Sequence, residues 1–217
     1  MRYELILLDI ETQRDFLLPG GSCYRPEARQ ARRRIAQLFA WAKAEGIPVL
    51  STVLRVRRNE RGPLADVPHC VEGTQGERKI PRTILPRRID LGLRNTTDLP
   101  NDLFDRYQQV IVEKRHTDIF AHARIERLLT ELSAGTFVVF GVGLAHGIAQ
   151  AAIGLRSRGF GVILAEDAVL DLGDDLAPMA ARRMEAKGVI FVPAREIVCP
   201  KPKPRVAPFR EALPARK

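Results

Sequence analysis

The chain has 217 residues, of which 45% are hydrophobic and 28% are charged, a composition typical of one globular domain with a sizeable core. No segment approaches the roughly 18 consecutive apolar residues of a membrane span, and no signal peptide is expected, because the first strand-like segment already carries acids. The three cysteines, Cys23, Cys70 and Cys199, are widely spaced, which argues against a disulfide framework or a zinc site and favours a cytoplasmic location.

The net charge of +9 is concentrated in part of the chain. More than half of this surplus lies in residues 199–217, which also contain five prolines, so this tail is predicted to be extended or disordered beyond a domain of residues 1–198. No nucleic-acid-binding motif accompanies the charge, so we interpret it as solvated surface; an anionic partner for the tail is the alternative. A second basic cluster, in a predicted loop, consists of Arg55, Arg57, Arg58 and Arg61.

The first half of the chain contains two predicted strands and one predicted helix. The strand over 3–10 is followed by a helix over 26–46, in which apolar residues recur at helical spacing and Gly46 ends the helix. The second strand covers 47–54. Residues 55–107 show little periodicity and many Arg, Pro and Gly, and so long an excursion within a compact domain is usually functional.

Regular alternation of strands and helices returns after residue 107. Because the strand-like runs are apolar on both faces, we expect an α/β fold with a parallel sheet covered by helices on both sides. Right-handed crossovers make such a sheet doubly wound, and they place ligands at the carboxyl ends of its strands. The predicted strands are 108–114, 136–143, 160–169 and 189–193, and the predicted helices are 123–134, 147–159 and 174–188.

Three acids, Asp9, Glu11 and Asp15, lie at the end of the first predicted strand or just after it. Asp9 and Glu11 are two residues apart, which puts them on the same face of a strand, where one of the pair can have a raised pKa and serve as a general acid. The alternative is that Asp15 caps the following turn, that Asp9 bonds to a loop backbone, and that Glu11 is merely exposed.

The third predicted strand ends in "VEKRHTDIF". Either Lys114 or Glu113 points into the crevice, and a lysine beside Glu11 would favour the carboxylate and hold a substrate anion. A surface lysine is the alternative. We interpret His116 and His122 as a loop and a helix-surface histidine rather than as ligands.

The fourth predicted strand runs into "GVGLAHGIAQ". Its glycines permit tight turns, and amides at the start of the following helix can bind an anion or an oxyanion. His146 lies at this turn, and both a substrate contact and a structural role stay open for it.

Four stretches together resemble the isochorismatase-like, or cysteine hydrolase, superfamily, which includes nicotinamidases. The resemblance spans roughly residues 3–197 and implies a three-layer sandwich with a six-stranded parallel sheet of order 3-2-1-4-5-6. It also implies a cis peptide bond near Val142–Gly143 and suggests Phe16, His69, Phe120 and His146 as substrate-binding residues. The stretches are "LLDIETQRDFLLPGG" (7–21), similar to D-x-Q-x-D-F and a Pro-Gly turn, "PHCVEGTQGERKIP" (68–81), similar to H-C-x-x-G-T-x-G, "VIVEKRHTDIF" (110–120), similar to K-x-x-x-x-x-F, and "VVFGVGLAHGIAQAA" (138–152), similar to G-V-x-x-x-x-C.

The catalytic residues of the superfamily are only partly present. By position, Glu11 stands where the catalytic Asp belongs, Lys114 matches the Lys, and Gly147 occupies the place of the nucleophilic Cys. Without a thiolate no thioester can form, so the resemblance implies that standard nicotinamidase activity is absent. Cys70 is not expected to replace the nucleophile, because the "HC" pair accompanies it in relatives.

The metal site of nicotinamidases is also expected to be absent, and no cofactor is predicted. The second strand of those enzymes ends in Asp-x-His, whereas "STVLRVRR" (51–58) offers neither residue, and His69 alone does not hold zinc.

True isochorismatases provide a thiol-free precedent, because they resemble this chain in carrying "G-V-x-A-H-x-G". Their acid protonates an enol carbon of a vinyl ether, and water then adds. In "GVGLAHG", however, His146 comes one residue later, Val53 and Leu54 stand where isochorismatases have a Gln, and the acid is Glu11.

Two hypotheses follow from these residues. The first is a thiol-independent hydrolase in which Glu11 moves a proton, Lys114 positions an anionic small-molecule substrate, and amides at His146–Gly147 bind developing charge. The second is a pseudoenzyme that keeps the fold as a binding or scaffold protein. The resemblance implies a homo-oligomer in either case, and no membrane partner is expected.

Overall fold

The computed structural model describes residues 2–173 and 175–198. Within these residues, seven parallel strands form one sheet of order β3-β4-β2-β1-β5-β6-β7. The strands are β1 (Arg2–Ile10), β2 (Val49–Leu54), β3 (Arg88–Asp90), β4 (Gln109–Lys114), β5 (Ser133–Val142), β6 (Gly161–Leu170) and β7 (Ile190–Val192). The helices are α1 (Arg14–Leu17), α2 (Ala28–Glu45), α3 (Leu103–Arg106), α4 (Ala123–Glu131), α5 (Ala149–Ser157), α6 (Ala177–Ala186) and α7 (Ala194–Ile197).

The predicted fold class is confirmed, with one addition to the sheet. The six predicted strands lie in the expected 3-2-1-4-5-6 order, and the short strand β3 joins the sheet beside β4. This strand comes from the excursion over 55–107, where three residues give too little alternation to indicate a strand.

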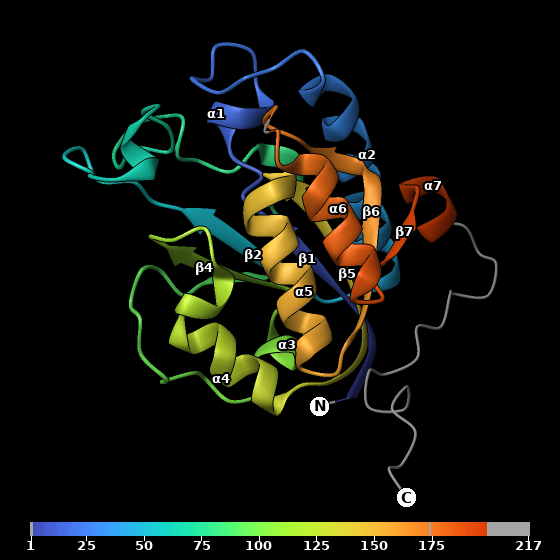
Figure 1. Cartoon of the computed structure of the whole chain (residues 1–217). Helices are drawn as coiled ribbons and strands as arrows, with labels where there is room; N and C mark the ends of the chain where they lie inside the picture. The colour runs from blue at the N-terminus through green and yellow to red at the C-terminus, as the bar shows by residue number, and fades with distance from the viewer. Residues whose placement is uncertain (1, 174, 199–217) are drawn as a thin grey trace, which may run out of the picture.

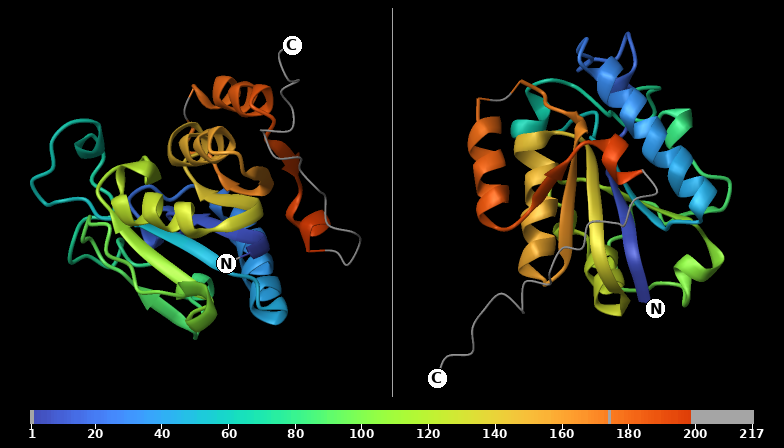
Figure 2. Two further views of the ribbon diagram at one scale, coloured as in Figure 1. Left: turned by 90° about the horizontal axis from the view of Figure 1, so that it is seen from below. Right: turned by 90° about the vertical axis from the view of Figure 1, so that its right-hand side faces the viewer.

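Helices cover both faces of the sheet (Figures 1 and 2). The right-hand view of Figure 2 shows α2 on one side of the sheet and α5 with α6 on the other. Along β1, Leu5 and Leu7 belong to the core cluster on the α2 side, while Ile6, Leu8 and Ile10 belong to the cluster on the α4 and α5 side. The run Leu5–Leu8 in the first strand is therefore apolar without interruption because both faces of the strand are buried there.

The helix predicted over 26–46 is α2. Its predicted apolar face is buried, and Gly46 ends it with φ 66°, a left-handed conformation that suits glycine. By contrast, the helix predicted over 123–134 ends at Glu131, because Ser133 already pairs with Arg2 at the start of β1. Strand pairing thus overrides the local helical pattern there.

No described residue is joined by a cis peptide bond, so the expected cis bond near Val142–Gly143 is wrong. The chain turns there by another route: Gly141 has φ 128° and Gly143 has φ 82°, and both conformations favour glycine.

Two predictions concern the end of the described part of the chain, namely the basic tail and the domain boundary. The tail over 199–217, with its suggested anionic partner, lies outside the described residues, and the domain boundary at 198 stays a prediction. No helix between residues 2 and 198, leaving out 174, is long and apolar enough to cross a membrane.

The close approach of β5 to β1 generates a prediction. A Cβ atom at Gly141 would lie 2.0 Å from the carbonyl oxygen of Ile10, in a backbone conformation that other residues rarely adopt. We expect Gly141→Ala to lower the free energy of unfolding by about 3 kcal/mol or more in urea denaturation. Gly20→Ala is the matched control, because Gly20 has φ 88° with nothing within 4 Å. Its cost should be about 1–2 kcal/mol, and equal losses for the two variants would contradict the prediction.

Candidate active site

Glu11 and Lys114 form a buried ion pair at the carboxyl ends of β1 and β4. Their side chains are 7% and 2% exposed, and the Lys114 ammonium donates to Oε1 of Glu11. Lys114 Nζ also donates to the backbone oxygens of His116 at 2.7 Å and Thr117 at 3.1 Å. All three ammonium protons are therefore used inside the protein, and Lys114 holds both Glu11 and the segment that follows β4.

The expectation that Asp9 and Glu11 share a face is wrong, because β1 ends at Ile10 and Glu11 has φ 52°. Asp9 continues the alternation of Leu5 and Leu7, whose side chains pack on the α2 side. The left-handed backbone at Glu11 breaks this alternation, so its carboxylate meets Lys114. Of the two side chains compared at the end of β4, Lys114 is the one paired with Glu11, while Glu113 pairs with Arg55.

Asp9 belongs to a second buried ion pair, with Lys79, which the sequence does not predict. Lys79 Nζ lies 2.5 Å from Oδ2 of Asp9 and 2.7 Å from Oγ1 of Thr12, and Ser51 Oγ donates to the same Asp9 oxygen at 2.7 Å. Lys79 is itself 6% exposed. The signal in the sequence was Asp9 itself, an acid directly after the apolar run Leu5–Leu8, because a buried carboxylate needs a partner.

Gln13 and Asp15, two polar residues of the first motif (7–21), both bond to backbone groups of the 68–81 loop. Gln13 donates from Nε2 to the backbone oxygens of Leu54 and Glu77, and its Oε1 accepts from Leu54 N at 2.8 Å. Asp15 accepts from Cys70 N at 2.6 Å and from Ser22 N at 3.3 Å. Asp15 therefore does bond a turn, as the alternative reading expected, and together the two side chains fasten the 68–81 loop to the end of the sheet.

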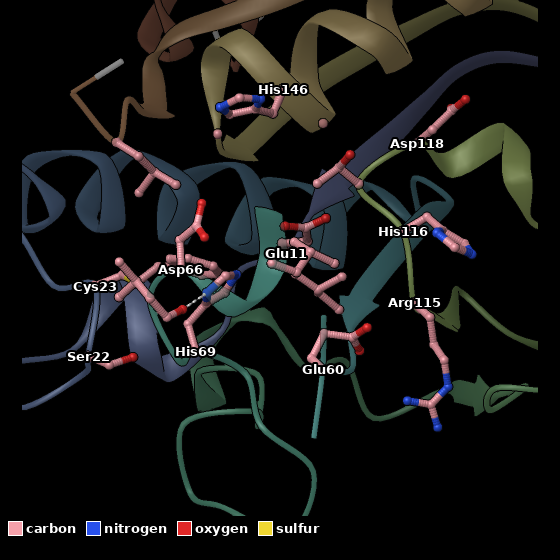
Figure 3. A pocket seen from close by; sticks show the side chains of 18 of the residues that line it. Glu11, Ser22, Cys23, Glu60, Asp66, His69, Arg115, His116, Asp118 and His146 are labelled. Atoms are coloured by element: carbon pink, nitrogen blue, oxygen red, sulfur yellow. Dashed lines mark hydrogen bonds between the residues drawn. The ribbon is translucent and has the colours of Figure 1, made fainter. Parts of the chain in front are cut away.

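A cavity of about 960 Å³ opens beside Glu11 (Figure 3). Figure 3 shows Cys23, Asp66 and His69 on one side of Glu11, Arg115, His116 and Asp118 on the other, and His146 beyond it. Lys114 is not among the lining residues, so the carboxylate of Glu11 lies between the lysine and the cavity.

Gly147 lines the same cavity, in a π-helical turn, Leu144–Ile148, that joins β5 to α5. A Cβ atom at this position would lie 3.6 Å from Glu11 Oε1, 3.4 Å from Thr117 O and 3.3 Å from Ile10 Cγ2. The glycine thus leaves space for about one side-chain atom directly beside the carboxylate. That this space corresponds to the nucleophilic Cys of the superfamily stays a prediction from the resemblance.

The structure brings most of the expected substrate-binding residues together. Phe16, His69 and His146 line the cavity with Glu11 and Gly147. The rings of Phe16 and His69 are 5.4 Å apart, so these two side chains form one wall.

Phe120 is not among the residues that line this cavity. Its ring lies against the guanidinium of Arg158, 3.8 Å from the ring centroid, and fills the space beside Gly154. The structure gives Phe120 a packing position on α5 instead.

His122, expected on a helix surface, is 3% exposed and caps α4 by accepting a hydrogen bond from Arg124 N. Burial lowers the pKa of His122, and the nearby charges of Arg124 and Lys114 lower it further.

The residues present do not fit the zinc site of nicotinamidases. At the expected place, just beyond β2, Arg55 forms ion pairs with Glu77 and Glu113. The positive charge of a guanidinium there disfavours the binding of a metal cation, and His69 is the single histidine of the 68–81 loop. Among the described residues no group of three or more His, Cys, Asp or Glu side chains could hold a metal ion.

Cys70 is fully buried, and it is not among the lining residues of the cavity. Burial raises the pKa of its thiol strongly, and the charges of Glu11 and Asp15 raise it further. Cys23 does line the cavity, and burial raises its pKa as well. Because the thiolate is the reactive form, neither environment activates a nucleophile.

These two environments predict different reactivity towards iodoacetamide. In a Cys199→Ser variant of the folded protein, we expect slow alkylation of Cys23 that speeds up from pH 7 to pH 9, because a raised pKa still leaves some thiolate. Cys70 should stay unmodified over this range and react only in urea. Peptide mass spectrometry measures both, and labelling of native Cys70 as fast as Cys23 would contradict the assignment.

Comparison with known proteins bears on the fold and the family. The family model of the Isochorismatase domain matches residues 94–196, and no curated protein sequence matches the chain.

Solved structures share the fold at low sequence identity. A nicotinamidase/pyrazinamidase from Bacillus subtilis is 19% identical with a TM-score of 0.68, covering 87% of this chain and 99% of its own. An isochorismatase family protein from Desulfovibrio vulgaris is 22% identical with a TM-score of 0.68, covering 90% of this chain and 96% of its own. A pyrazinamidase of Pyrococcus horikoshii, in complex with zinc, is 20% identical with a TM-score of 0.66, and the match covers 88% of this chain and 99% of that one. Together these matches agree with the resemblance that the four motifs indicate: residues 94–196 match the model of the Isochorismatase domain, and the chain shares the fold of these solved structures.

Proposed function

We propose that this chain is a thiol-independent hydrolase that acts on a small molecule held in the cavity beside Glu11. The observation that carries the proposal is the position of the Glu11 carboxylate, which faces an open cavity while Lys114 holds it from behind. A carboxylate fixed in this way can take a proton from water or give one to a substrate.

Gly147 supports a reaction without a thiol. The space that its missing side chain leaves is within 3.6 Å of Glu11 Oε1 and 3.4 Å of Thr117 O. A water molecule or a substrate atom in that space would lie next to both oxygens. In the proposed reaction Glu11 removes a proton from water, and the water oxygen bonds to the substrate atom that carries the leaving group. The bond between that atom and the leaving group then breaks, and Glu11 gives the proton to the leaving group.

Lys114 has a different role here from the one the sequence suggested. Its three protons are engaged with Glu11, His116 O and Thr117 O, so we assign it to positioning Glu11 rather than to a substrate anion. An anionic substrate group would instead meet Arg25 and Arg61, exposed cations in the lining of the cavity.

The amides at His146–Gly147 also contribute less than expected. His146 N donates to Gly143 O at 3.1 Å, so the proposed reaction does not use that N–H to stabilise developing charge.

The second candidate is a binding or scaffold protein without catalysis. The complete set of bonds at Lys114 favours it, because such a pair also serves simply to anchor residues 115–117. This candidate keeps the cavity for a ligand but assigns no proton transfer to Glu11.

Turnover separates the two candidates. We expect the wild-type protein to hydrolyse at least one member of a panel of vinyl ethers, amides and ureides, measured by product formation. Glu11→Gln should reduce turnover by about a hundredfold or more while binding persists, because the amide cannot accept the proton. Glu45→Gln, an exposed acid at the end of α2, is the matched control. Turnover that survives Glu11→Gln would contradict the enzyme proposal, and binding across the panel without turnover would favour the scaffold.

A further inference from the structure

A second cavity, of about 440 Å³, opens at the amino ends of the strands. Its volume lies within the roughly 300–1,000 Å³ typical of small-molecule sites. We call it the lower cavity, because α3 and the start of β1 lie at the lower end of the sheet in Figure 1. Its lining consists of Tyr3, Lys43, Ala44, Gly46, Pro48, Pro86, Arg87, Phe104 and Gln108.

The lower cavity is separate from the cavity beside Glu11. Tyr3 lies near the start of β1, whereas Glu11 follows the end of the same strand. At about 3.3 Å per residue the two positions are about 25 Å apart, and the two cavities have no lining residue in common. A ligand in the lower cavity therefore cannot touch the residues of the proposed reaction.

The charged side chains that line the lower cavity are both cations. Lys43 comes from the last turn of α2 and Arg87 from the residues just before β3, and no described Asp or Glu lines this cavity. Within the described part of the chain, neither cation forms an ion pair. One terminal nitrogen of Arg87 donates to the backbone oxygens of Asp105 at 3.3 Å and Arg106 at 3.4 Å, which orients the guanidinium. A cavity lined by charges of one sign attracts small molecules of the opposite charge.

Rings of aromatic residues and proline form the apolar part of the lining. Phe104 and Pro48 are buried, and the rings of Tyr3 and Phe104 meet edge to face with their centroids 5.8 Å apart. The Tyr3 hydroxyl donates to Oδ1 of Asp105 at 3.1 Å, which holds the ring in place. Burial and this bond raise the pKa of Tyr3 to about 12, so its ring is neutral and does not repel an anion. Apolar surface of a ligand placed here is removed from water at little cost in side-chain freedom.

Gln108 separates the lower cavity from the carbonyl end of α2. Its Nε2 donates to Ala42 O at 2.6 Å and to Ile47 O at 3.2 Å, and Ala42 O also accepts from Ile47 N at 3.0 Å. Unpaired carbonyl oxygens at the end of a helix would repel an anion. Because these oxygens are already bonded, the charges of Lys43 and Arg87 dominate the lower cavity.

We propose that the lower cavity is a binding site for a small organic acid, with one carboxylate and an apolar chain. The carboxylate lies between Lys43 and Arg87, and the chain covers Tyr3, Pro48 and Phe104. A neutral molecule of the same length lacks the first contact, and an acid as short as acetate lacks the second. The site goes beyond the hydrolysis proposed at Glu11 and does not depend on it.

The test uses hexanoate, hexanamide and acetate in ¹H–¹⁵N NMR titrations of the full chain, followed at the backbone amides of Ala44, Gly46 and Gln108. Hexanoate should shift these amides with saturation. It should bind about fivefold more tightly than hexanamide, because two exposed ion pairs each add modestly to the affinity. It should bind about tenfold more tightly than acetate, because acetate leaves the rings in contact with water.

Lys43→Gln combined with Arg87→Gln should lower the affinity for hexanoate to that for hexanamide and leave the affinity for hexanamide unchanged. Arg182→Gln combined with Lys187→Gln is the matched control, because it removes the same charge from exposed positions that line neither cavity. It should leave both affinities unchanged.

Three results would overturn the inference, whatever the turnover assays at Glu11 find. One is that hexanoate and hexanamide bind equally well or do not bind. Another is that the preference for hexanoate survives the change of Lys43 and Arg87. The third is that hexanoate shifts only amides around Gly147, at the other cavity.

Discussion

The ion pair between Glu11 and Lys114 is the interaction on which the arrangement of the site depends. Both side chains are almost fully buried, and a buried charge without its partner costs several kcal/mol, so each residue fixes the other. The pair joins the ends of β1 and β4, two strands that are separated in the sheet by β2. Through His116 O and Thr117 O it also sets the path of residues 115–118, which line part of the cavity.

The surrounding polar side chains keep Glu11 in its left-handed conformation. The Asp9–Lys79 pair lies just before it, and Gln13 just after it connects the end of β2 to the 68–81 loop. A non-glycine residue with positive φ is uncommon and persists where its surroundings hold it. Two ion pairs and one amide side chain thus fix a single carboxylate at the cavity, with the space beside Gly147 in front of it.

Much of the fold could be predicted from the sequence because its signals are local. The doubly buried strands read as continuous apolar runs, and α2 shows both its apolar face and its terminal glycine. Strand β3 and the early start of β5 could not be predicted, because both depend on pairing with a neighbouring strand rather than on local pattern.

The candidate site was predictable to the extent that it follows the carboxyl ends of the strands. Glu11, Gly147 and His146 lie at the cavity for that reason. The partner of Asp9 was not predictable, because Lys79 lies 70 residues away in a loop without periodicity. The place of Phe120 depends on the close approach of α5 at Gly154, which no motif encodes.

A double-mutant cycle with Glu11→Gln and Lys114→Met, read as the free energy of unfolding in urea, tests the central claim most directly. Lys114→Met leaves a buried carboxylate alone and should cost about 3–5 kcal/mol. The account predicts that adding Glu11→Gln restores part of this loss, so that the double variant is more stable than Lys114→Met alone. Costs that simply add would contradict it, because the two side chains would then be independent of one another.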